Sequence, residues 1–172
     1  MKDKELPYSV GDWIVHYIYG VGQVKKVEKK RLNKTKALYY KVEAKDSVYW
    51  VPVEKSNSKR IRPLTSRTSL KRAIRLLKKA PDEMDPNHKK RESRIKKIKA
   101  EGTLFSLCQI VRDLSAKERQ SPLSTKDKQA LETFKDLLLR EWSVCVGISI
   151  EDARREMQDS LQESWMKMPA EG

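Results

Sequence analysis

The hydrophobic pattern of the chain changes near residue 65, and this change restricts the possible folds more than any other feature. Before it, short segments are rich in Val, Ile, Tyr and Trp, a composition that favours β-strands. After it, apolar residues recur every three or four positions, which is the spacing of one helix face. We therefore predict an α+β protein with two domains: a β domain at 1–64 and a compact all-α bundle of about five helices at 65–172.

Within the β domain, four segments are predicted to be strands: 12–18, 23–32, 36–44 and 47–53. The run Gly20-Val21-Gly22 interrupts them and predicts a tight turn. Pro52 cannot donate a backbone hydrogen bond, so its strand should lie at a sheet edge or end there. Short strands this close together predict a small, strongly bent sheet or barrel.

Five helices are predicted in the second domain from apolar spacing and from residues that start or stop helices. Two cysteines, Cys108 and Cys145, fall inside apolar helical patterns and are predicted to be small core residues. The predicted helices are one around 70–77 capped by Ser66 or Thr68, one from Asn87 to about 100 before Gly102, one at about 103–116, one from Ser124 or Thr125 to Gly147, and one from Ser149 onward.

The sequence lacks the residue patterns of common catalytic and cofactor sites. It has neither a phosphate-binding Gly-x-x-x-x-Gly-Lys-Ser/Thr loop nor a Gly-x-Gly-x-x-Gly fingerprint, and no Gly-x-Ser-x-Gly. His16 and His88 lie in different predicted domains, and no metal-ligand spacing is present. We therefore expect a protein that binds rather than an enzyme, with no catalytic residues, metal or cofactor.

Two cysteines in such a chain do not make a disulfide framework, which favours a reducing compartment. No apolar stretch follows the N-terminus, and no apolar run approaches the roughly 18 residues of a membrane span. The expected location is therefore the cytoplasm, without a membrane, and nothing in the sequence demands more than a monomer.

Positive charge is concentrated in the first hundred residues. The formal net charge is +14, divided as +8 in residues 1–64, +9 in 65–100 and −3 in 101–172. This asymmetry points to a polyanionic partner. Two runs carry most of it, 25–36 and 88–99. On a helix, Lys90, Arg94 and Lys97 share one side, which could neutralise phosphates, and a helix start also attracts phosphate. The alternative is a basic helix that is only solvated.

Several motifs, in the same order, resemble the CarD family of bacterial RNA-polymerase-binding transcription regulators. The motifs are 10–16 (Val-Gly-Asp-Trp-Ile-Val-His), 20–22 (Gly-Val-Gly), 51–53 (Val-Pro-Val), 61–62 (Ile-Arg), 110–114 (Ile-Val-Arg-Asp-Leu), 123–124 (Leu-Ser) and 127–128 (Asp-Lys). The resemblance implies a Tudor-like β domain, a helical DNA-binding domain, and location on the nucleoid.

The resemblance also implies the partners. The β domain would pair a strand edge with the RNA polymerase β subunit, where Lys30 and Trp50 stand in place of family arginines. A core position is the alternative for Trp50. The implied polymerase-binding residues are Lys29, Lys30, Arg31, Leu32, Tyr49, Trp50 and Val51.

The helical domain would bind upstream promoter DNA through the minor groove and the phosphates, and would modulate open-complex stability. His88 stands where the family has a wedge Trp, and an exposed His88 without such a role is the alternative. The implied DNA-binding residues are Asn87, His88, Lys89, Lys90, Arg91, Arg94, Lys97 and Lys128. A rival function is an accessory nucleic-acid-binding protein that acts without polymerase.

Overall fold

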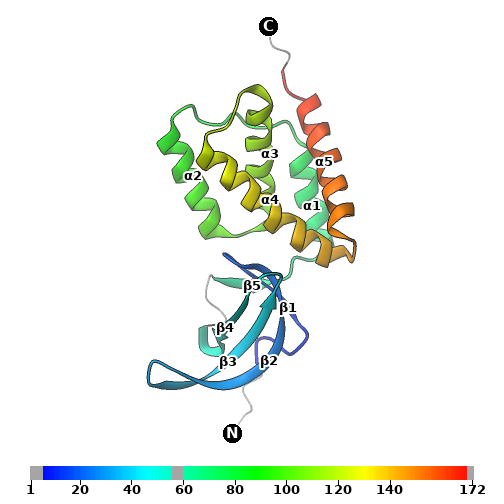
Figure 1. Cartoon of the computed structure of the whole chain (residues 1–172). Coiled ribbons are helices and arrows are strands. Elements are labelled where there is room, and N and C mark those ends of the chain that lie inside the picture. Colours follow the sequence, from blue (N-terminus) through cyan, green and yellow to red (C-terminus); the bar gives the residue numbers. More distant parts are fainter. Residues whose placement is uncertain (1–5, 56–59, 170–172) are drawn as a thin grey trace. The chain divides into compact units, whose positions relative to one another are not determined.

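A computed structural model describes residues 6–55 and 60–169 of the chain, which divides into two compact units, Met1–Leu64 and Thr65–Gly172 (Figure 1). The first unit is a β-sheet and the second is helical, and each has its own hydrophobic core. The predicted α+β arrangement, a β domain followed by a helical domain, is confirmed.

The β unit is an antiparallel sheet with the strand order β4-β3-β2-β1-β5. Period-2 alternation places Ile14, Val24, Tyr40 and Val42 on one face, where all four are fully buried. Pro52 ends β4 at an edge of this sheet, as predicted. The elements are β1 (Trp13–His16), β2 (Gly20–Leu32), β3 (Thr35–Ala44), β4 (Val48–Pro52), a 3-10 turn η1 (Val53–Lys55), and β5 (Ile61–Pro63).

The prediction of a tight turn at residues 20–22 is wrong. These residues begin β2, and Gly20 pairs with His16 while Gly22 pairs with Ile14. A Cβ on Gly22 would lie 2.8 Å from Cγ1 of Val42, so the glycine serves close strand packing. Gly20, with φ of 74°, closes the turn that lies at residues 17–19, so the turn was predicted a few residues late and the packing glycine Gly22 was taken as part of it.

The second unit contains five helices within the described residues: α1 (Arg67–Lys78), α2 (His88–Glu101), α3 (Leu104–Gln120), α4 (Thr125–Val146) and α5 (Ile150–Met166). Each is preceded by a residue whose side-chain oxygen accepts a backbone N–H of the first turn. Gly102 and Gly147 end α2 and α4 in the left-handed conformation, with φ of 60° and 70°. Only α3 extends well past its predicted end, because its last turn is polar and lacks apolar periodicity.

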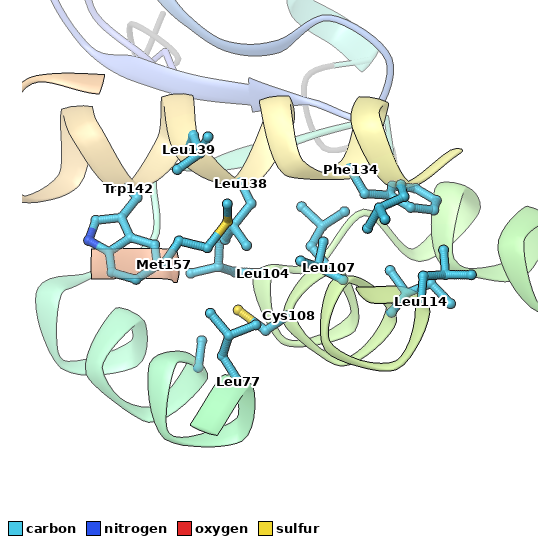
Figure 2. Close-up of a cluster of buried hydrophobic side chains, with 14 of the residues drawn as sticks. Leu77, Leu104, Leu107, Cys108, Leu114, Phe134, Leu138, Leu139, Trp142 and Met157 are labelled. Carbon is cyan, nitrogen blue, oxygen red and sulfur yellow. The ribbon is translucent and has the colours of Figure 1, made fainter. Parts of the chain in front are cut away.

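The helical core forms where α1, α3, α4 and α5 meet (Figure 2). Trp142 of α4, Met157 of α5 and Leu77 of α1 all belong to this buried cluster. Both cysteines are buried and unpaired, as predicted for core residues. Burial raises the pKa of the Cys108 thiol to about 12, so this thiol is protonated at neutral pH.

Candidate functional site

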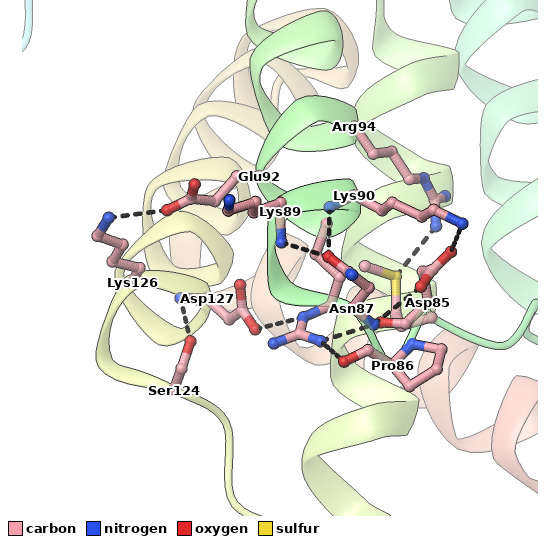
Figure 3. A network of polar contacts seen from close by, with 12 residues as sticks. Asp85, Pro86, Asn87, Lys89, Lys90, Glu92, Arg94, Ser124, Lys126 and Asp127 are labelled. Atoms are coloured by element: carbon pink, nitrogen blue, oxygen red, sulfur yellow. Dashed lines mark hydrogen bonds and ion pairs between the residues drawn. The ribbon is translucent and has the colours of Figure 1, made fainter.

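At the start of α2, the backbone N–H groups are hydrogen-bonded to the capping residue Asn87. The side-chain Oδ1 of Asn87 accepts from the backbone N–H of Lys89 at 2.9 Å and of Lys90 at 3.3 Å. The backbone N–H of Asn87 donates in turn to Asp85 at 2.8 Å. These N–H donors, which were predicted to attract a phosphate, are therefore occupied by Asn87 (Figure 3). Asn87 acts here as a helix cap, and His88 is the exposed first residue of α2.

Arg91 is the clearest departure from the predicted DNA-binding set. Its side chain is buried, and its Nε donates to Asp127 Oδ2 at 2.9 Å. Its Nη1 donates to the carbonyl oxygens of Asp85 at 2.9 Å and Pro86 at 2.8 Å. The guanidinium therefore connects the loop before α2 to the start of α4, and Arg91 is not available for the predicted contact with DNA.

Arg94 is also held by the protein. Its Nη2 lies 2.6 Å from Asp113 Oδ2, and its Nη1 donates to the sulfur of Met84 at 3.0 Å. Asp113 is almost fully buried and also accepts from Arg112 Nε at 2.8 Å. The predicted row of Lys90, Arg94 and Lys97 therefore contains one side chain that is directed to the helical core.

The remaining predicted cations do face solvent. Lys90 has 72% of its side chain exposed and Lys97 has 76%, and their nearest carboxylates, on Asp85 and Glu101, are 3.8 Å and 3.9 Å away. Exposed ion pairs this long contribute little to stability, so both ammonium groups are available to another partner. The exposed members of the predicted DNA-binding set, apart from the cap Asn87, are His88, Lys89, Lys90, Lys97 and Lys128.

Sequence reasoning missed the cations of a shallow groove between α2 and α4. Lys96 and Lys99 of α2 line it together with Lys126 of α4. Lys126 Nζ lies 2.7 Å from Glu92, and this hydrogen bond lowers the pKa of the Glu92 carboxyl. Lys96 and Lys99 belong to the basic run that the sequence reveals, but only the tertiary contacts Arg91–Asp127 and Glu92–Lys126 show that α4 lies beside it.

In the β unit, Trp50 and Lys30 are in contact. The Nζ of Lys30 lies 3.3 Å from the centre of the Trp50 ring, a cation–π geometry. The indole N–H donates to Glu28 at 2.8 Å. Trp50 is half-buried and lies outside the hydrophobic cluster, so the alternative of a core tryptophan is wrong. Lys30 and Trp50, the two residues that stand in place of family arginines, therefore contact each other at the surface.

The other predicted polymerase-binding residues divide between two faces of the sheet. Tyr49 and Val51 are buried on the core face and cannot present their side chains. Residues 29–32 alternate, because successive strand side chains point to opposite faces. Lys30 and Leu32 share the face of Trp50, whereas Lys29 and Arg31 lie on the opposite one. The predicted set is therefore not a single surface.

The backbone of β4 has one open edge within the described sheet, since only β3 pairs with it. Ala44 N–H donates to Ser47 O at 2.9 Å, and the register continues from this turn to Tyr39 and Pro52. Alternate residues of an antiparallel strand bond to the neighbour, so the N–H and C=O of Trp50 point away from β3. Trp50 therefore presents both the unpaired backbone groups of the sheet edge and its indole side chain.

Each of the two units matches a known protein family. Residues 8–65 match the family described as the CarD-like/TRCF RID domain, and residues 72–158 match the C-terminal domain of CarD. The chain belongs to the CarD family. A CarD-family protein with this domain is an RNA-polymerase-interacting transcription regulator.

The CarD-family motif at residues 110–114 has a structural role in this chain. Arg112 and Asp113 are both buried, and Arg112 also donates to the carbonyl of Leu76 at 3.1 Å and to Asp82 at 3.0 Å. This motif therefore anchors the loop that precedes α2. In the described ranges, 6–55 and 60–169, no cluster of side chains has the composition of a metal site, and no helix is long and apolar enough to cross a membrane.

Proposed function

We propose that this CarD-family regulator binds the RNA polymerase β subunit through the open edge of β4 and binds upstream promoter DNA through the exposed cations of α2 and α4. Holding both partners would change the stability of the open promoter complex. The observation that carries the proposal is the edge of β4 beside the Lys30–Trp50 pair, inside a domain whose family interacts with polymerase.

The polymerase contact is proposed to be the addition of a strand to the sheet. An edge strand offers unpaired N–H and C=O groups that another chain can use. Trp50 offers both groups and an indole, and Pro52 offers only a carbonyl, so the added pairing would end there. Tyr49 and Val51 support this contact from beneath by anchoring β4 in the core.

The DNA contact is proposed to rest on phosphates and the minor groove. Lys89, Lys90, Lys97 and Lys128 are exposed and would release counterions on binding, which gives strong salt dependence. His88 stands at the exposed start of α2 and has less apolar area than an indole wedge. Open-complex lifetimes with the His88→Ala and His88→Trp variants would test this position, and we expect His88→Trp to lengthen the lifetime relative to wild type.

The direct test of the polymerase contact is a pull-down of purified polymerase by the whole chain at low salt. Val48→Pro removes an outward-facing N–H of β4 without removing a bond to β3. Trp50→Ala removes the indole. We expect both variants to lose polymerase binding while keeping duplex binding. A wild-type chain that binds duplex DNA but not polymerase would instead support the accessory nucleic-acid-binding function.

We further propose that the protein acts as a monomer in the cytoplasm, associated with the nucleoid. The net charge of +14 supports attraction to nucleic acid and repulsion between copies. Sedimentation of the purified chain should show one protomer, and a stable dimer would contradict this part of the proposal.

A further inference from the structure

The β2–β3 hairpin extends beyond the rest of the sheet (Figure 1). Within the described residues, β4 pairs with β3 only at 39–43, and β1 pairs with β2 only at 20–23. Residues 29–38 therefore pair only with one another, in a two-stranded ribbon. Asn33 and Lys34 form its turn, with φ of 50° and 67°, the positive values that suit the twist of a hairpin.

One face of this ribbon is predominantly cationic, with the half-buried Leu38, opposite Lys29, as its apolar member. Lys29 and Arg31 of β2 share it with Lys36 of β3, and Lys34 lies at the turn. All four are exposed, and none of them takes part in an ion pair among the described residues. Arg31 and Lys36 are direct cross-strand partners. Like charges placed directly opposite each other destabilise a strand pair.

Such a ribbon has low stability when no partner is bound. An isolated two-stranded hairpin is marginally stable in water, and repulsion across Arg31 and Lys36 weakens it further. A bound polyanion would turn this repulsion into attraction. The arrangement therefore suggests a binding surface rather than a solvated loop.

We propose that the Lys29–Arg31–Lys36 face of the ribbon binds the phosphate backbone of duplex DNA. This is a second DNA contact, made by the β unit, in addition to the one proposed for α2 and α4. It does not use the face of Trp50 and Lys30, because strand alternation separates the two faces. A two-stranded ribbon also fits the major groove of B-form DNA.

The two faces of the ribbon differ in a way that favours DNA over protein on the cationic side. The opposite face carries Leu32, which is 40% exposed, and Lys30, whose ammonium group lies over the ring of Trp50 in β4. Aromatic residues are enriched at protein interfaces. The cationic face offers lysine, which protein interfaces disfavour and phosphates attract. Each face therefore has a different preferred partner.

The test uses the whole chain with Lys29→Gln, Arg31→Gln and Lys36→Gln combined. Binding to a short mixed-sequence duplex is followed by fluorescence anisotropy at several salt concentrations. Each lost phosphate contact lowers the slope of log affinity against log salt by about 0.9. We expect the slope to fall by roughly 2 to 3, and the affinity at low salt to fall at least about tenfold.

The matched control removes the same charge from dispersed exposed positions: Lys45→Gln, Lys71→Gln and Arg155→Gln. It should keep most of the wild-type slope, and circular dichroism should show both variants folded. The ribbon variant should still bind polymerase. An unchanged slope, or an equal loss in the dispersed control, would overturn the proposal. Lost polymerase binding with unchanged DNA binding would assign the face to an acidic protein surface and would also overturn it.

A third variant separates the two proposed DNA contacts. Lys89→Gln, Lys90→Gln and Lys97→Gln on α2 should lower the slope independently, and the combined variant should show the sum of both losses. If only the α2 variant lowers the slope, the ribbon proposal is wrong and the helical contact stands. If only the ribbon variant does, the helical contact is the one that fails.

Discussion

The two basic runs of this chain look alike in sequence and differ in structure. In α2, Arg91 and Arg94 point inward and bond to carboxylates, whereas the neighbouring lysines remain exposed. In the β2–β3 hairpin, Arg31 is as exposed as Lys29. Guanidinium groups suit buried, multiply bonded positions better than ammonium groups, but they need acceptors nearby. The number of cations in a run therefore does not tell how many are available to a partner.

The largest expected effect is on stability, and it distinguishes the buried cation Arg91 of α2 from the exposed cation Lys90. Arg91→Ala leaves Asp127 buried and unpaired, and should lower the free energy of unfolding of the helical unit by about 3–5 kcal/mol. Lys90→Ala should change it by at most about 0.5 kcal/mol, since Lys90 is exposed. Urea denaturation followed by circular dichroism measures both. Equal effects would show that Arg91 is not the structural member of the run.

A second prediction compares how the two units handle a buried basic group. The helical unit pairs Arg91 with a carboxylate, but burial, with a smaller effect of Arg60, lowers the pKa of His16 to about 4. His16 Nδ1 also accepts from the backbone N–H of Ile18 at 3.1 Å and of Tyr19 at 3.3 Å, which requires an unprotonated nitrogen. The histidine is therefore neutral in the folded β unit.

The lowered pKa of His16 determines the direction in which the stability of the β unit changes with pH. The contribution of neutral His16 to stability is complete above the unfolded pKa near 6.5 and is lost as the pH falls toward about 4. Between about pH 7.5 and about pH 5, the β unit should lose about 2 kcal/mol from this group. Urea unfolding monitored by amide NMR signals of the β unit measures the loss. The His16→Gln variant should show a smaller loss, and an equal one would refute the assignment to His16.

The smallest expected effect concerns the only cation of the ribbon with an aromatic partner. A double-mutant cycle with Lys30→Ala and Trp50→Leu should give a coupling energy of about 0.5–1 kcal/mol, as for an exposed cation–π pair. The same cycle with Lys29 in place of Lys30 should give a coupling near zero, because Lys29 lies on the other face. Equal couplings would show that the two faces of the ribbon are not distinct.

Local signals in the sequence predicted the order of elements and most helix boundaries. Asn87 and Gly102, for example, begin and end α2 where the capping rules placed them. The ion pairs of Arg91 and Arg94 could not be predicted, because their acceptors on Asp127 and Asp113 come from other helices. The grouping of residues 29–32 as one surface was wrong because successive side chains of a strand point to opposite faces of the sheet.

Open-complex lifetime on a single promoter tests the central claim most directly, which is that one chain holds polymerase and promoter DNA together. The comparison is between wild type and a variant with Lys89→Gln, Lys90→Gln, Lys97→Gln and Lys128→Gln, all exposed positions. We predict that both bind polymerase and that only wild type changes the lifetime markedly. A variant that changes the lifetime as much as wild type would contradict the account.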